Sequence, residues 1–152
     1  MKDRCNLMGM PEQGFENVHV VHEYWDGPRT GIADYGGRPH WFENVFDQEQ
    51  DDYSEVYWLT PLSDNALRLA RQQVELFFRW RQAFGKGEVD LSTHSVLPED
   101  RATYERLGNA IRLEVASNAN TRFKTRGHLK RLGAPLQPGT ISDFQVKWDT
   151  EE

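Results

Sequence analysis

The chain of 152 residues has a single cysteine and no long hydrophobic run. One cysteine, Cys5, excludes an intramolecular disulfide and favours a reducing compartment. No stretch approaches the roughly 18 consecutive apolar residues that cross a bilayer, and the first residues lack the apolar segment of a signal peptide. We therefore expect a cytoplasmic protein without a membrane-spanning segment.

Sequence motifs for nucleotide binding and nucleophilic catalysis are also missing. The chain contains no GxGxxG, no P-loop and no GxSxG. Paired carboxylates occur at residues 51–52 and 99–100, where they fit a solvated loop and a helix start better than a buried acid–base couple. We predict no cofactor, no metal ion and no catalytic residue, and we favour a protein without enzymatic activity.

Aromatic side chains and an uneven distribution of charge are what the chain does have. Eight Phe, five Trp and five Tyr supply a large apolar area for the core of one domain. Residues 1–60 contain twelve acids and four bases, whereas residues 121–152 contain six bases and four acids. The net charge of −6 disfavours nonspecific binding to nucleic acid.

Alternating side chains predict strands at residues 18–25, 30–35, 39–46 and 55–62. The first three are separated by Asp26-Gly27-Pro28 and by Gly36-Gly37, which are typical of tight turns. Residues 47–55 carry five acids and no base, so we expect a solvated loop there. Residues 141–148 alternate again and predict a late strand that joins this β-meander.

Between these strands the apolar spacing becomes helical. Ser63 is a plausible N-cap, and apolar residues then recur at helical spacing as far as Gly85. Pro98 and the two acids after it predict the start of a second helix that ends near Ser117. We therefore predict one α+β domain over residues 15–152, a mainly antiparallel sheet packed against two helices, after a flexible arm at residues 1–14.

The leading functional hypothesis concerns the turns of the meander. Arginine forks and aromatic rings beside glycine turns suit recognition of a protein or small molecule, and the acidic surface suits a basic protein partner. A homodimer is an alternative partner. The residues predicted for this surface are Trp25, Asp26, Arg29, Asp34, Arg38, His40 and Trp41.

A second hypothesis is a small metal-dependent or hydrolytic enzyme. His22 and His40, with Asp34 or Glu43 nearby, would resemble a His–His–carboxylate set if the strand register brought them together. The sequence HEYWD at residues 22–26 does not support a helical HExxH zinc motif, because the segment alternates and runs into Gly27-Pro28.

A third hypothesis is a phosphate or nucleic-acid binder. Residues 121–131 hold five bases and no acid, with Phe123 among them. The alternative, which we favour because the whole chain is acidic, is that these bases pair with the protein's own acids or are solvated. The bases are Arg122, Lys124, Arg126, Lys130 and Arg131.

The segment YWDGPRTGIADYGGRPHWF at residues 24–42, together with LPED at residues 97–100, resembles small bacterial proteins of uncharacterised function. The resemblance extends over about residues 18–115. It implies a bacterial cytosolic origin, and it brings no activity and no catalytic residue.

Overall fold

The computed structural model describes residues 11–132 and 142–149 of the chain. Backbone contacts divide the chain into two compact units. One unit combines Met1–Leu62 with Asn118–Glu152, and the other is Ser63–Ser117. The folding of residues 15–152 as one domain, and the packing of the sheet against the helices, stay predictions.

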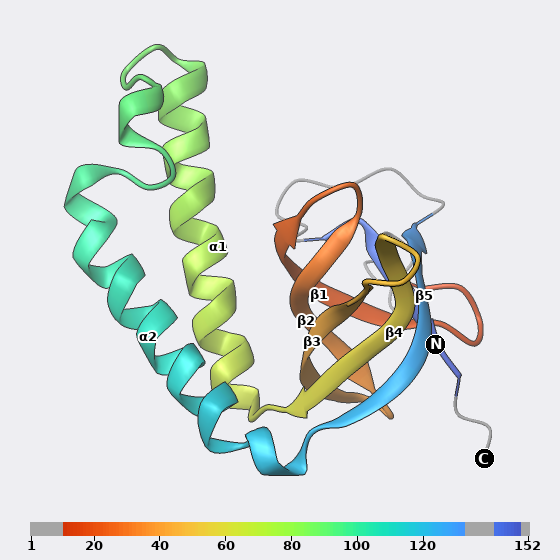
Figure 1. The fold of residues 1–152 in the computed structure, drawn as a ribbon. Coiled ribbons are helices and arrows are strands. Elements are labelled where there is room, and N and C mark those ends of the chain that lie inside the picture. The colour runs from red at the N-terminus through yellow and green to blue at the C-terminus, as the bar shows by residue number, and fades with distance from the viewer. Residues whose placement is uncertain (1–10, 133–141, 150–152) are drawn as a thin grey trace, which may run out of the picture. The chain divides into compact units, whose positions relative to one another are not determined.

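The first unit contains the strands, all of them antiparallel (Figure 1). They follow one another around a closed barrel in sequence order, because the last strand pairs with both the first and the fifth. The α+β class and the antiparallel sheet are thus confirmed, whereas closure of the sheet into a barrel was not predicted. The strands in the described chain are β1 (Glu16–Tyr24), β2 (Pro28–Tyr35), β3 (Arg38–Asp47), β4 (Asp52–Pro61), β5 (Phe123–Arg131) and β6 (Phe144–Trp148).

Two details of the strand prediction need correction. The acidic loop expected at residues 47–55 is reduced to a turn at residues 48–51, because β3 continues to Asp47 and β4 begins at Asp52. The basic segment is a strand, β5, and supplies the pairing that links β4 to β6.

The barrel interior is filled by large side chains packed against small ones. A Cβ on Gly127 would lie 2.4 Å from ring atoms of Trp148, so only glycine fits beside that indole. Trp148 in turn lies edge-on to Tyr57 at a ring-centroid distance of 5.6 Å. Burial raises the pKa of Tyr57, because the phenolate form would lose its hydration. The cluster of buried core residues that pack together consists of Val18, Ala33, Phe42, Tyr57, Leu59, Val146 and Trp148.

Both predicted turns of the meander are present. Gly36 and Gly37 have φ values of 63° and 80°, and Tyr35 pairs with Arg38, as in a two-residue hairpin. Asp26 and Gly27 also have positive φ, 57° and 129°, between β1 and β2. The turns therefore occur where the sequence predicted them.

The second unit contains the two predicted helices, α1 (Asp64–Gly85) and α2 (Arg101–Ser117). Ser63 caps α1 by accepting a hydrogen bond from the Ala66 N–H (3.1 Å). The Glu114 carboxylate accepts from the Ser63 N–H at 2.6 Å, which ties the end of α2 to the start of α1. No described helix is long and apolar enough to cross a membrane.

Candidate binding surface

Six of the seven residues predicted for the binding surface lie toward two opposite ends of the barrel, and the seventh, Trp41, lies between them, opposite Ile32. Trp25, Asp26 and Arg29 lie at or beside the β1–β2 turn, whereas Asp34, Arg38 and His40 flank the β2–β3 turn. The eight residues of β2 separate these turns by roughly 25 Å, since a strand rises about 3.3 Å per residue. We call them the Trp25 end, with residues 25–27 and 48–51, and the Gly36 end.

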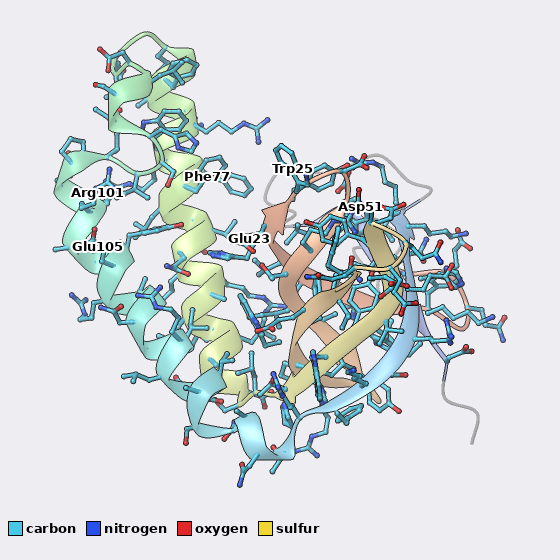
Figure 2. The ribbon with its side chains drawn as sticks, in the orientation of Figure 1. Glu23, Trp25, Asp51, Phe77, Arg101 and Glu105 are labelled. Carbon is cyan, nitrogen blue, oxygen red and sulfur yellow. The ribbon has the colours of Figure 1, made fainter. Side chains whose placement is uncertain are left out.

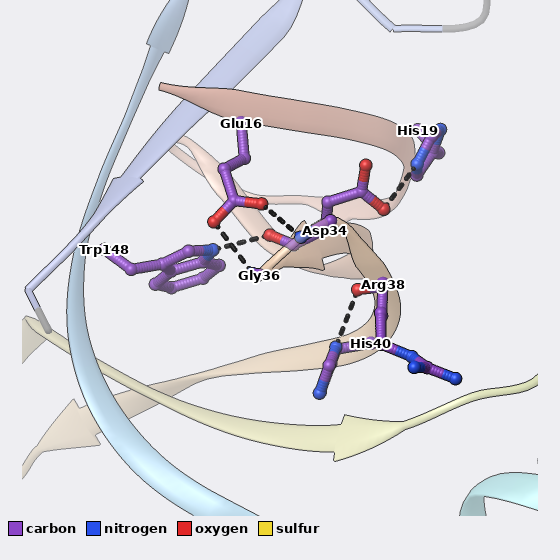
Figure 3. A network of polar contacts seen from close by, with 8 residues as sticks. Glu16, His19, Asp34, Gly36, Arg38, His40 and Trp148 are labelled. Carbon is purple, nitrogen blue, oxygen red and sulfur yellow. Dashed lines mark hydrogen bonds and ion pairs between the residues drawn. The ribbon is translucent and has the colours of Figure 1, made fainter. Parts of the chain in front are cut away.

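Polar groups at the Gly36 end are used within the barrel (Figure 3). The Glu16 carboxylate accepts hydrogen bonds from the N–H groups of Gly36 (3.0 Å) and Gly37 (2.8 Å). The Trp148 indole N–H donates to the Asp34 carbonyl at 2.7 Å, and the Asp34 carboxylate lies 2.9 Å from His19 Nε2. Asp34 therefore holds β2 to β1 and β6.

His40 is a packed residue of the barrel wall. His40 is only 7% exposed, and its Nδ1–H donates a hydrogen bond to the Arg38 carbonyl at 2.8 Å. Its ring contacts Tyr35 and Phe123, with centroid distances of 5.7 and 5.8 Å. The hydrogen bond and the two ring contacts fix the His40 side chain in the barrel wall.

The two histidines of the enzyme hypothesis point to opposite faces of the sheet. His22 is exposed and lies against Trp41, with ring centroids 5.7 Å apart. Trp41 is the strand neighbour of His40, so their side chains project from opposite faces. Among residues 11–132 and 142–149, no three His, Cys, Asp or Glu side chains are grouped to hold a metal ion. Cys5 lies outside the described residues.

At the Trp25 end, the Arg29 side chain joins two turns. Its guanidinium donates to the carbonyls of Trp25 (2.7 Å) and Asp26, and to Asn44 Oδ1 on β3 (2.6 Å). The same group lies 3.6 Å above the ring centroid of Tyr53 on β4. Arg29 therefore fastens the β1–β2 turn to the β3–β4 hairpin and is not itself free to bind a ligand.

Large aromatic side chains are exposed around this fixed arginine. Trp25 is 72% exposed, Tyr24 56% and Phe46 41%. Tyr24 contacts the ring of Phe144 on β6 at 6.3 Å, and Phe46 contacts Tyr53 at 5.1 Å. Tyr24, Phe46 and Tyr53 were not among the predicted site residues, although their positions at strand ends follow from the register of the meander.

Acidic side chains lie at the same end of the barrel as these rings. Figure 2 shows Trp25 and Asp51 at this end of the barrel. Within the described part of the chain, none of the acids of the β3–β4 turn region forms an ion pair, and most are exposed. Those acids are Asp47, Glu49, Asp51 and Asp52. The Trp25 end thus combines exposed rings with acids that form no ion pair among the described residues.

The five bases between residues 122 and 131 fall into two groups according to what they contact. Arg126 lies 3.9 Å from Glu55, Lys130 lies 3.1 Å from Glu12, and Arg131 pairs with Asp143. The hydrogen bond from Lys130 lowers the pKa of Glu12. Arg122 and Lys124 instead contact the ring of Trp58.

Comparisons of the chain with protein-family models, curated proteins and solved structures find no match.

Proposed function

We propose that this chain is a non-catalytic binding protein that recognises a basic protein partner through the Trp25 end of its barrel. The observation that carries the proposal is the 72% exposure of Trp25 beside two other exposed rings. Tryptophan and tyrosine are enriched among the residues that dominate binding energy in protein interfaces. A cytoplasmic location, favoured by the single cysteine, is part of the proposal.

The charge of this end supports a basic partner. Asp51 and Asp52 are exposed, and neither forms an ion pair with a described base. Complementary charge speeds association and excludes acidic partners, while the rings supply the apolar contact. Fixing of the turns by Arg29 reduces the entropy lost on binding, since the backbone under Trp25 is already ordered.

The test compares the two ends of the barrel. Partners captured with the intact chain are purified, and their affinities are measured for wild type, Trp25→Ala and the matched control Arg38→Ala. Arg38 is also exposed but lies at the Gly36 end. We expect Trp25→Ala to weaken binding about 30-fold, as for a residue worth about 2 kcal/mol, and Arg38→Ala to have no effect.

Two further measurements refine the test. Asp51→Lys together with Asp52→Lys is expected to slow association and to reduce its dependence on salt. Size-exclusion chromatography of the purified chain tests a second copy as the partner. Equal losses in Trp25→Ala and Arg38→Ala, or unchanged affinity in Trp25→Ala, would contradict the proposal.

A further inference from the structure

The outer face of β4 and β5 carries two bases that form no ion pair with any acid among residues 11–132 and 142–149. Three of the five bases in residues 122–131 form the ion pairs described above, and the remaining two are Arg122 and Lys124. Both are exposed, and neither lies within ion-pair distance of an acid in the described part of the chain.

Trp58 holds these two bases together. Its strand neighbours Tyr57 and Leu59 are buried in the barrel core, so the Trp58 side chain projects from the outer face. The Arg122 guanidinium carbon lies 3.9 Å from the Trp58 ring centroid, and the Lys124 ammonium lies 5.0 Å from it. Lys124 is also the backbone pairing partner of Trp58 on β5.

A guanidinium stacked on an indole keeps its N–H groups available. The donors lie in the plane of the guanidinium, so contact through its face leaves its edge free for a planar or tetrahedral oxyanion. The stack also restricts the long Arg122 side chain before any ligand binds. Lys124 adds a second positive charge at the same ring, and the repulsion between the two cations falls when an anion lies between them.

The acid that lies directly across the sheet from Trp58 forms its hydrogen bond with another residue. Glu43 on β3 pairs with Trp58 across the sheet, and its carboxylate accepts a hydrogen bond from the Trp41 indole N–H at 3.1 Å. No ion pair between Glu43 and Arg122 or Lys124 is present among the described residues.

We infer that Arg122, Lys124 and Trp58 form a binding site for one phosphate group of a small ligand. Two cations match one phosphate, whereas a nucleic-acid backbone is gripped through many phosphates along a basic surface. Here the other bases of β5 are paired with acids, and the net charge of the chain is −6. This site is independent of the Trp25 end, so either proposal can fail alone.

The test is a titration followed at the indole N–H resonance of Trp58, which Trp58→Phe assigns. Inorganic phosphate and a nucleoside monophosphate are added at constant ionic strength, with chloride as the reference anion. Two charge-assisted hydrogen bonds predict saturable binding with a Kd of about 1 mM. We expect Arg122→Gln to weaken it at least tenfold and Lys124→Gln severalfold. The controls Arg126→Gln and Lys130→Gln should leave it unchanged.

The two ligands separate the two sources of phosphate. Tighter binding of the nucleotide than of free phosphate assigns a phosphorylated metabolite, and equal binding assigns free phosphate. The inference is overturned if the Trp58 resonance responds to phosphate no more than to chloride, or if Arg126→Gln weakens binding as much as Arg122→Gln does. A single-stranded oligonucleotide is titrated in the same way. The inference is also overturned if the oligonucleotide binds with a steep salt dependence and neither small ligand binds.

Discussion

The two ends of the barrel are built from similar residues but have different surfaces. Both carry a glycine turn with an aspartate and an arginine beside it. At the Gly36 end, Glu16 and Trp148 bind the turn and the strand that leads into it. At the Trp25 end, Arg29 binds the carbonyls of the β1–β2 turn and Asp47 accepts from two N–H groups of the β3–β4 turn, and the rings stay exposed. Hydrogen bonds within the barrel therefore occupy the polar groups of the Gly36 end, whereas the rings of the Trp25 end remain exposed.

The largest expected effect comes from Trp148 at the Gly36 end. Trp148→Ala removes a buried ring from the core and leaves the Asp34 carbonyl without its indole donor. We expect the free energy of unfolding to fall by about 3–5 kcal/mol, as for other large-to-small substitutions in cores. Urea unfolding followed by circular dichroism measures it. A loss below about 1 kcal/mol would mean that this end is not tied together as described.

Tyr57 is a buried ring, and its contribution to the free energy of unfolding should depend on pH. Its pKa is raised by burial, so the unfolded chain loses the phenol proton at lower pH than the folded chain does. The corresponding stability is fully present below the unfolded pKa of about 10 and is lost as pH rises through the folded value.

The variant Tyr57→Phe removes this contribution. We expect its unfolding free energy to decline less steeply above pH about 10 than that of wild type, by at most about 1.4 kcal/mol per pH unit. Urea titrations at several alkaline pH values measure the two slopes. Parallel slopes would contradict this, because they would mean that the pKa of Tyr57 is the same in the folded and the unfolded chain.

Glu16 tests the hydrogen bonds to the Gly36 turn. Glu16→Gln keeps the size of the side chain but removes its charge and one of its two acceptor oxygens. We expect a loss of about 1 kcal/mol in unfolding free energy, since these bonds are exposed to solvent. Glu23→Gln is the matched control, because the one hydrogen bond that Glu23 accepts from a described residue is the 3.3 Å bond from Thr30. Equal losses of unfolding free energy in the two variants would contradict the difference in hydrogen bonding between the two ends.

Trp25→Ala should have the smallest effect on stability. Its side chain is largely exposed, so the substitution should change the unfolding free energy by no more than about 0.5 kcal/mol. The same variant is expected to bind the partner about 30-fold more weakly, which separates recognition from folding at this position. A cost of several kcal/mol would instead make Trp25 a structural residue.

Much of the fold could be predicted because its signals are local. Glycine turns and alternating side chains predict the meander, and the Ser63 cap with helical spacing predicts α1. β5 was missed because its bases obscured a period of two. Phe123, Gly127 and Leu129 are less exposed than the basic residues between them. Closure of the barrel also depends on pairing of β1 with β6, which no short window of sequence contains.

The site was harder to predict because partners of polar residues are distant in the sequence. Asp34 and Arg29 are alike as polar residues near turns. The indole donor to Asp34 lies 114 positions further along the chain, and the Asn44 acceptor of Arg29 lies 15 positions away on another strand. Residue type therefore identified candidates, and only the register showed which of them were already engaged.

The path of the chain between β4 and β5 has a consequence for engineering. These strands are hydrogen-bonded neighbours, yet 55 residues, Ser63–Ser117, separate the two segments of the barrel unit in sequence. The Asn118 side-chain amide donates to the Pro61 carbonyl at 2.8 Å, so departure and return points adjoin. The helical segment is therefore an insertion between two paired strands, and a short loop across this gap would preserve the strand order of the barrel.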